Sequence, residues 1–183
     1  MDLLDPALMI AGVATTAIMF AVVAFFSRAG SRRTVGALLA ATPVVPMVMF
    51  FDRIAAQLGW WHYPSVAAAS APLSWYVAAA LWYGAALGLV GWRLIRRWAT
   101  PGLLAFVMLF ALFGVARDYA YSVTTRLIVF GPGLIPLLAD LFAYASAAVV
   151  VQLLMRWIVG PAKSDALART PKPQAQNQDR RTL

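Results

Sequence analysis

Five apolar segments, each about as long as a transmembrane helix, constrain this chain more than any other feature of its sequence. They cover residues 7–26, 35–56, 73–91, 102–118 and 134–155. The chain has 183 residues, of which 62% are hydrophobic and only 12% are charged. A soluble domain of this size has no interior large enough for so much apolar surface. We therefore predict an all-α, polytopic membrane helical bundle of about five transmembrane helices.

The basic residues predict the orientation of this bundle. They gather after the first, third and fifth segments, as Arg28, Arg32 and Arg33, then Arg93, Arg96 and Arg97, then Arg156 and the tail. No Lys or Arg lies in residues 1–27 or 58–72. Because positively charged loops stay in the cytoplasm, we predict an N-out, C-in protein of the inner (plasma) membrane. The formal net charge of +8 thus reflects membrane topology, and we predict no binding of nucleic acid.

The chain divides into a transmembrane domain over residues 1–160 and a polar segment over residues 161–183. This last segment holds Lys, Arg, Gln and Pro but no aromatic residue. Such a segment buries too little apolar area to offset the entropy lost on ordering it. We predict that it is a disordered cytoplasmic tail.

Proline and small residues mark two special positions in the bundle. Pro43 and Pro46 lie inside the second apolar segment, where they should kink the helix or interrupt its hydrogen bonds. Ala80, Gly84 and Gly88 recur every four residues in the third segment, and this small-residue face lets another helix approach closely. We expect this face to pack within the bundle, or to bind a membrane-protein partner or a second copy of the chain.

Most of the remaining polar and aromatic groups are predicted at the outer ends of the helices, in one leaflet. They are Asp52, Arg53, Trp60, Trp61, His62, Tyr63, Arg117, Asp118, Tyr119, Arg126 and Asp140. A charge in hydrocarbon costs several kcal/mol, roughly 3 on insertion scales, so these groups should pair with one another or line a polar cavity. In one interpretation they are ion pairs and interfacial anchors that fix the helix ends. In the other they line a pocket that opens to the outer leaflet.

In the pocket interpretation, Asp140 and Asp52 are the candidate catalytic acids, and Asp140 lies deeper in the membrane. Arg117 or Arg53 would hold an anionic head group or set the pKa of the acid. The other members of the set are candidate substrate-binding residues, and their tryptophan and tyrosine rings would stabilise a carbocation through their faces.

Several common chemistries have no support in the sequence. The chain contains no cysteine and no glutamate, so it has no disulfide and no thiol nucleophile. It also lacks a GxSxG nucleophile motif, a GxxxxGKS/T phosphate loop, and any paired histidine or aspartate motif typical of metal sites. We predict neither a metal nor a cofactor.

The stretch that begins at Asp52 resembles a known family. Asp52 is followed by Gly59-Trp60-Trp61-His62-Tyr63 and then by Pro72-Leu73-Ser74-Trp75 at the start of the next helix. This order is similar to the small membrane domain of the heterodimeric-type lycopene cyclases, with its acidic residue, Gly-x-Trp-x-aromatic turn and Pro-Leu-Glu-Glu helix entry. The resemblance covers about residues 51–85 and implies a helical membrane fold and an isoprenoid-like, carotenoid-related ligand. Ser74 and Trp75 stand where that family has paired glutamates, so only Asp52 carries over as an acid.

These observations lead to three hypotheses for function. The first is binding or processing of an isoprenoid-like or other long apolar lipid at the outer-leaflet pocket, with acid-initiated cyclisation or isomerisation as the reaction class. The alternative is a non-enzymatic subunit or assembly factor of a membrane protein complex, docked through the small-residue face. A third is a proton- or solute-coupled transporter with a broken second helix and two aspartate relays. Membrane lipids are the expected partners.

Overall fold

The computed structural model describes residues 6–64, 71–165 and 167. Its elements in chain order are α1 (Pro6–Ser27), α2 (Ser31–Ala41), α3 (Val44–Leu58), β1 (Trp61–His62), α4 (Leu73–Ala79), the π-helix η1 (Ala80–Ala86), α5 (Leu87–Trp98), α6 (Thr100–Thr124), β2 (Val129–Phe130), α7 (Ile135–Val159) and the 3₁₀ turn η2 (Ala162–Ser164). The described chain is mainly helical, and its strands form one short antiparallel pairing, in which Trp61 lies opposite Phe130 and His62 opposite Val129.

Five helices in the described chain are long and apolar enough to cross a membrane. They are α1, the pair α2 and α3, the series α4, η1 and α5, then α6, and finally α7. α6 and α7 have 25 residues each, and at 1.5 Å per residue this length of about 37 Å exceeds the ~30 Å hydrocarbon core. The prediction of five helices of membrane-spanning length is confirmed. The third and fourth helices run beyond their predicted ends, to Trp98 and Thr124. The added turns contain Arg and Tyr, whose long side chains can stay in contact with apolar surface while their polar tips reach water.

The second membrane-length helix is interrupted where its prolines predict. α2 ends and α3 begins on either side of Thr42 and Pro43. Pro43 has no N–H to donate to the preceding turn, and the N–H of Thr42 bonds the carbonyl of Leu39, three residues back instead of four. Pro46 lies in the first turn of α3, where a missing N–H costs no intrahelical bond. The predicted kink is therefore present, and Pro43 causes it.

The small-residue face of the third membrane-length helix packs against the chain itself. Ala80 is buried, as are Gly84 and Gly88. A Cβ atom placed on Gly84 would lie 2.7 Å from Cβ of Ala41 in α2, and one on Gly88 would lie 2.9 Å from Cγ1 of Val151 in α7. The predicted close approach of helices is confirmed. Because helices of the same chain occupy this face, it is not an open surface for a partner or a second copy.

A π-helical segment that we did not predict lies at the centre of the same helix. η1 joins α4 to α5 without a break. A π-helix has i→i+5 hydrogen bonds, so it changes the direction in which the following side chains point relative to a regular α-helix. Trp82 and Tyr83 belong to this segment, and both line a cavity inside the bundle.

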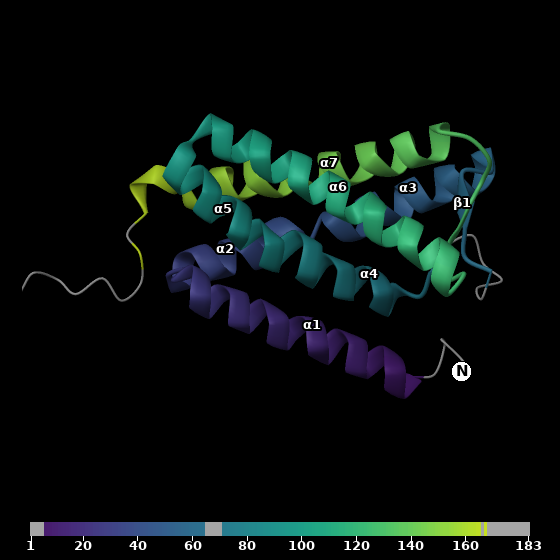
Figure 1. The fold of residues 1–183 in the computed structure, drawn as a ribbon. Helices are drawn as coiled ribbons and strands as arrows, with labels where there is room; N and C mark the ends of the chain where they lie inside the picture. Colours follow the sequence, from purple (N-terminus) through teal and green to yellow (C-terminus); the bar gives the residue numbers. More distant parts are fainter. Residues whose placement is uncertain (1–5, 65–70, 166, 168–183) are drawn as a thin grey trace, which may run out of the picture.

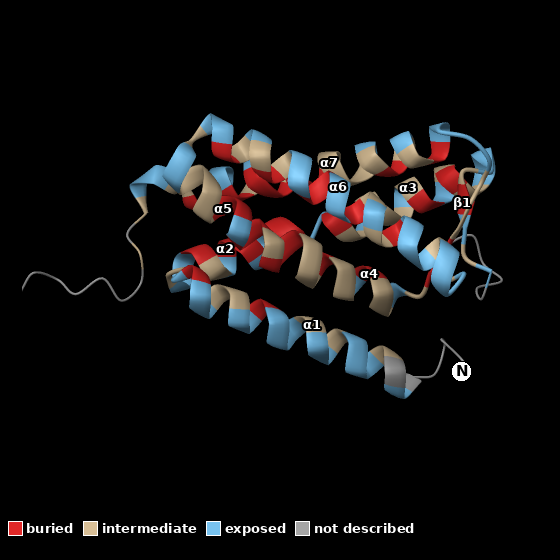
Figure 2. Cartoon of the chain, in the orientation of Figure 1, coloured by how far each residue is buried: buried red, intermediate tan, exposed pale blue. Residues whose placement is uncertain are grey.

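Buried residues lie between the helices, whereas the outer faces of the bundle are mostly exposed (Figure 2). α1 lies along one edge of the bundle, beside α4 (Figure 1). Large apolar side chains point outward on several helices; Phe26 is 75% exposed and Trp157 is 83% exposed. An outer surface of this kind is typical of a protein that is surrounded by lipid.

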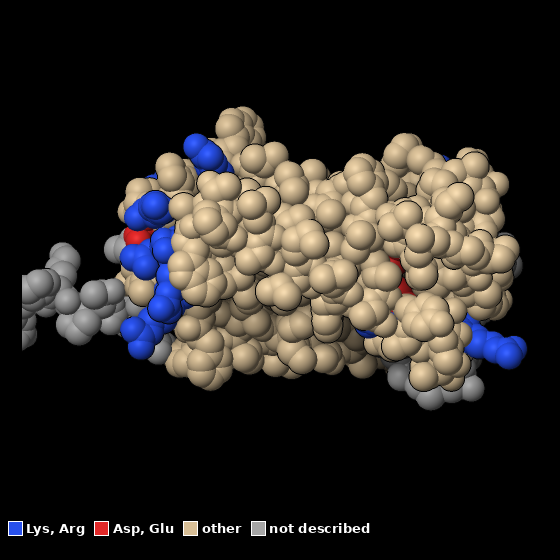
Figure 3. Space-filling model, turned by 45° about the horizontal axis from the view of Figure 1, so that its top comes forward, with Lys and Arg blue, Asp and Glu red and all other residues tan. Residues whose placement is uncertain are grey.

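Most of the basic residues in view gather at the end of the bundle away from β1, and a few lie at the other end (Figure 3). At the end away from β1, Nε of the buried Arg33 donates to Oδ2 of Asp165 at 2.5 Å, and its Nη2 donates to the carbonyl of Gly160 at 3.0 Å. Nε of Arg96 donates to the carbonyl of Asp165 at 2.9 Å. Residues 161–165 thus pack against the helices, although we predicted a disordered tail from residue 161. The rest of that predicted tail, apart from Leu167, lies outside the described residues.

Candidate functional site

Two glycines turn the chain back over the end of α3. Gly59 has a φ of 68°, the left-handed conformation in which many helices end. Gly131 packs against Gly59 so closely that a Cβ atom would collide with the carbonyl oxygen of Gly59. The N–H of Gly131 also donates to the carbonyl of Trp60 at 2.7 Å. This reversal brings the indole of Trp61 within hydrogen-bond distance of Asp52.

Asp52, in the last two turns of α3, accepts hydrogen bonds from three neutral donors. Its Oδ1 accepts from Nε1 of Trp61 at 3.0 Å and from the hydroxyl of Tyr63 at 3.2 Å, and its Oδ2 accepts from the hydroxyl of Tyr76 at 2.7 Å. The hydroxyl of Tyr76 in turn accepts from the N–H of Ala71 at 2.9 Å. Asp52 is 4% exposed. Its carboxyl group therefore links α3, β1 and α4, and protein donors occupy both of its oxygens.

Tyr63 remains a hydrogen-bond donor in this cluster. Its burial, together with the negative charge of Asp52, raises the pKa of Tyr63 well above its usual value of 10.0. The hydroxyl therefore keeps its proton at physiological pH and donates a hydrogen bond to Asp52. The ring of Tyr63 lies edge-on to Trp75, with 6.2 Å between the ring centres, and this contact joins the cluster to the wall formed by α4.

Arg117 and Asp118, in the last two turns of α6, form an ion pair enclosed by three tyrosines. Nε and Nη2 of Arg117 both donate to Oδ1 of Asp118, Nε at 2.7 Å. Nη1 donates to the hydroxyl of Tyr83, and Nη2 donates to that of Tyr144 at 2.5 Å. The hydroxyl of Tyr144 donates to Oδ2 of Asp118 at 2.8 Å. The guanidinium carbon lies 4.7 to 5.7 Å from the ring centres of Tyr83, Tyr121 and Tyr144, which is within cation–π range.

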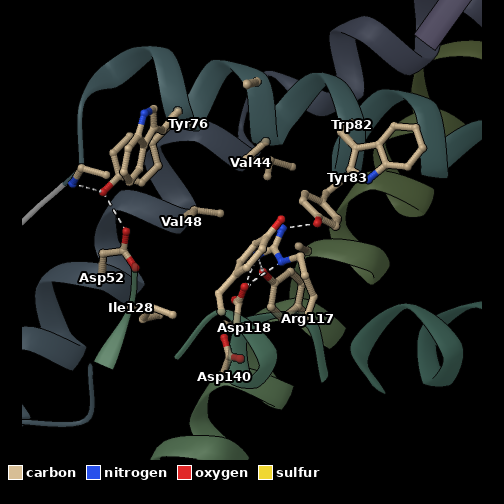
Figure 4. A pocket seen from close by; sticks show the side chains of 18 of the residues that line it. Val44, Val48, Asp52, Tyr76, Trp82, Tyr83, Arg117, Asp118, Ile128 and Asp140 are labelled. Atoms are coloured by element: carbon tan, nitrogen blue, oxygen red, sulfur yellow. Dashed lines mark hydrogen bonds and ion pairs between the residues drawn. The ribbon is translucent and has the colours of Figure 1, made fainter. Parts of the chain in front are cut away.

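Asp140, in the second turn of α7, lacks partners of this kind. It is 5% exposed, and its Oδ2 has no hydrogen-bond partner among the described residues. Its carboxyl group lies beside that of Asp118 (Figure 4). Leaving a buried polar group without a partner costs about 1–3 kcal/mol, and more if the group is charged. Of the three acids at this end of the bundle, Asp140 is the one with a buried oxygen that has no partner among the described residues.

These three acids line one cavity of about 590 Å³, within the size range of small-molecule sites. Its walls come from α1, α3, α4, η1, α6, α7 and the segment before β2, and they are mainly apolar or aromatic. Residues of this kind include Val44, Val48, Trp75, Trp82, Phe113 and Ile128. Asp118 and Asp140 lie on one side of the cavity, and Val44 and Trp82 lie on the other (Figure 4).

The cavity region reaches the long side of the bundle as well as its interior. Acidic atoms are visible in a recess on this side (Figure 3). Among the described residues the acids are Asp52, Asp118, Asp140 and Asp165, and Asp165 pairs with Arg33 at the basic end. The acidic atoms in the recess therefore belong to a residue that lines the cavity.

The structure brings some of the predicted site residues together and leaves others apart. Asp52, Trp61, Tyr63, Arg117, Asp118 and Asp140 line the cavity, whereas Arg53, Trp60, His62, Tyr119 and Arg126 do not. Except for the partly buried Trp60, this second group is exposed. Arg53 and Tyr119 directly follow cavity residues on their helices, and successive helical side chains point about 100° apart. In these two cases the rotation takes the side chain off the face that lines the cavity.

Among the described residues, neither Arg117 nor Arg53 is free to hold an anionic head group in the cavity, which was one of the two roles that we expected of them. Arg53 is exposed and outside the cavity. Arg117 uses four of its N–H groups on its own neighbours, one from Nε, one from Nη1 and two from Nη2. Its charge is balanced by Asp118.

We did not predict the tyrosines that complete these clusters. Tyr76 and Tyr83 are seven residues apart, which is about two helical turns, and Tyr144 follows Asp140 by four residues, which is about one turn. Each spacing puts two hydroxyl or carboxyl groups on one helix face. This spacing was the available signal, but tyrosine near a membrane surface is common enough to be interpreted as an anchor.

No family model, curated protein or solved structure matches this chain. The geometry of the cavity therefore supplies the grounds for assigning a function.

Proposed function

We propose that this chain is a multi-pass inner-membrane protein that binds an isoprenoid-like or other long apolar lipid in the cavity between α3, α4, α6 and α7. The observation that carries this proposal is the unpartnered Oδ2 of the buried Asp140, at the edge of a mainly apolar cavity of about 590 Å³. A hydrocarbon chain suits the apolar and aromatic walls. The polar or reactive part of the lipid would then meet Asp140.

In this proposal the cavity opens to the outer leaflet. Most of the basic residues in view gather at the opposite end of the bundle (Figure 3), and the positive-inside rule assigns such an end to the cytoplasm. This gives the N-out, C-in orientation. A lipid of the outer leaflet would enter from the side, through the recess in which acidic atoms are visible, without crossing water.

Acid-initiated isomerisation or cyclisation is the reaction class that such a pocket would support. Asp140 would give a proton to one carbon of a ligand double bond, which leaves a carbocation on the other carbon. Loss of a proton from a neighbouring carbon to the Asp140 carboxylate would form the new double bond, after ring closure in a cyclisation, and would restore the acid. The step needs no oxidant or reductant. The rings of Trp75 and Trp82, which line the cavity, would stabilise the cation through their faces.

The resemblance to the membrane domain of lycopene cyclases supports the same class of ligand. The matched residues Asp52 and Trp75 both line the cavity. Ser74, at the other position where that family has a glutamate, is partly buried with an unpartnered Oγ. Because protein donors occupy the oxygens of Asp52, the acid in our proposal is Asp140, which lies on α7 outside the matched stretch.

The alternative, a non-enzymatic subunit of a membrane complex, would need a docking face other than the one we predicted. Ala41 and Val151 of the same chain fill the space beside Gly84 and Gly88. A partner would therefore have to bind the outer, lipid-facing surface of the bundle.

Native mass spectrometry of the protein, purified in mild detergent, tests the proposal. We expect one apolar lipid per chain in the wild type and its loss in Ala79→Phe, which puts a ring into the cavity without changing charge. Leu109→Phe, at a position of α6 that is 64% exposed and outside the cavity, is the matched control and should keep the lipid. Stoichiometric partner polypeptides with no specific lipid would overturn the proposal in favour of the subunit alternative.

A further inference from the structure

We propose that the lipid in this cavity carries a hydrogen-bond-donor head group, a hydroxyl or an amine, that binds Oδ2 of Asp140, and that lipids headed by phosphate or carboxylate are excluded. This inference rests on the proposed function and specifies its ligand class. It follows from the charges and hydrogen bonds of the residues that line the cavity.

The cavity contains an excess of acids. Arg117 is the one Lys or Arg among the described residues that line it, against Asp52, Asp118 and Asp140. Arg117 is paired with Asp118. An anionic head group would therefore join two further carboxyl groups with no unpaired cation nearby, whereas phosphate sites in proteins are usually built from Arg, Lys or exposed backbone N–H groups.

Among the three acids of the cavity, only Asp140 has an oxygen without a partner among the described residues, and a carboxyl oxygen can accept a hydrogen bond even when the other oxygen carries the proton that the proposed reaction needs. Asp52 receives bonds from Trp61, Tyr63 and Tyr76. Asp118 receives bonds on both of its oxygens, from the side chains described above. Asp140 alone keeps an unpartnered buried oxygen. No side chain among the described residues donates to this oxygen, so a hydroxyl or amine head group that donated to it would remove the cost of burying it.

The position of Asp140 also predicts how the ligand lies. The carboxyl group of Asp140 is beside Asp118 on one side of the cavity, and Val44 and Trp82 lie on the other side (Figure 4). A donor head group at Asp140 would direct the hydrocarbon chain toward Val44 and Trp82. Both ends of the ligand would then meet walls of matching polarity.

Binding of four compounds with the same farnesyl-type chain tests this inference: the hydrocarbon farnesene, the alcohol farnesol, farnesylamine and farnesyl diphosphate. Affinity is measured from the ligand-dependent rise of the unfolding temperature in lipid nanodiscs, with partitioning corrected by empty discs. We expect farnesol and farnesylamine to bind about tenfold or more tightly than either farnesene or farnesyl diphosphate.

Two variants assign the effect to Asp140. Asp140→Leu should reduce the affinity for farnesol to that for farnesene and leave farnesene binding unchanged. Asp140→Asn keeps one carbonyl acceptor, so its affinity for farnesol should be intermediate. Arg126→Gln changes a charge at the same end of the bundle outside the cavity and should leave the order of affinities unchanged.

Failure of this inference and failure of the proposed function give different results. If farnesyl diphosphate binds as tightly as farnesol, or if Asp140→Leu leaves farnesol binding unchanged, the head-group inference is overturned while lipid binding stands. If none of the four compounds binds the wild type, both are overturned.

Discussion

The hydroxyl of Tyr76 in α4 donates a hydrogen bond of 2.7 Å to Oδ2 of Asp52 in α3, and both side chains are buried. The same hydroxyl accepts the N–H of Ala71, so one tyrosine joins the carboxyl group to the backbone at the start of α4. This contact holds one wall of the cavity in place. Asp52 thus joins α3 to α4, and in our proposal the ligand binds Asp140.

Tyr76→Phe should destabilise the protein. The substitution removes the short bond to Asp52 and leaves the N–H of Ala71 without its partner. We expect the free energy of unfolding to fall by about 1–3 kcal/mol, seen as a lower thermal unfolding midpoint in detergent. Tyr119→Phe, at an exposed position outside the cavity, is the control and should leave the midpoint unchanged. Equal midpoints for the two variants would contradict the role of Tyr76.

Asp52→Leu and Asp140→Leu should differ in their effect on stability. The first leaves the donors of Trp61, Tyr63 and Tyr76 without an acceptor, so the unfolding midpoint should fall strongly. The second removes an unpartnered buried polar oxygen, so the midpoint of the ligand-free protein should stay the same or rise. Thermal unfolding of the two purified variants makes the comparison. A larger loss of stability in Asp140→Leu than in Asp52→Leu would sink our assignment of roles.

Gly84→Ala should destabilise the single chain. The new Cβ would lie 2.7 Å from Cβ and 3.1 Å from Cα of Ala41, and the backbone of α2 cannot move away easily. Overpacking of this kind costs about 1–3 kcal/mol. Gly12→Ala adds the same methyl group where no atom lies within 4 Å and should be tolerated. Unfolding midpoints and the mass of the protein in detergent are the measurements; a change of oligomeric state at unchanged stability would contradict packing within the chain.

Cysteine labelling tests the predicted orientation, because the chain has no cysteine of its own. Pro132 lies in the exposed loop at the cavity end, and Ser31 is exposed at the basic end, so each is replaced by cysteine in turn. We expect a membrane-impermeant maleimide to label Pro132→Cys in intact cells and Ser31→Cys only after the membrane is permeabilised. The reverse pattern would place the cavity in the inner leaflet.

Helix number and the kink were predictable because each depends on a local property of the chain. Hydrophobic length alone predicts five helices, and Pro43 interrupts a helix whatever its surroundings. The acids Asp52, Asp118 and Asp140 could also be assigned to one end, since helices that alternate in direction bring their matching ends together.

The partners of these acids could not be predicted, because they depend on tertiary contacts. Nothing in the sequence distinguishes Asp52, which receives three hydrogen bonds, from Asp140, whose Oδ2 receives none. The composition of the small-residue face around Gly84 is equally suited to packing against a helix of the same chain and against a helix of a partner. The sequence alone leaves Arg117 without a partner for its charge except Asp118 beside it, whereas in the fold Tyr83, Tyr144 and Asp118 surround it.

Photocrosslinking with a photoreactive isoprenoid alcohol tests the central claim most directly, because it reports where the lipid lies. In native membranes we predict saturable labelling of residues around Trp82 in η1 and around Ala143 in α7, which unlabelled farnesol competes away and Ala79→Phe abolishes. Labelling that does not saturate and is spread over outward-facing residues such as Phe26 and Trp157 would show that the lipid only surrounds the protein, and would contradict a binding cavity.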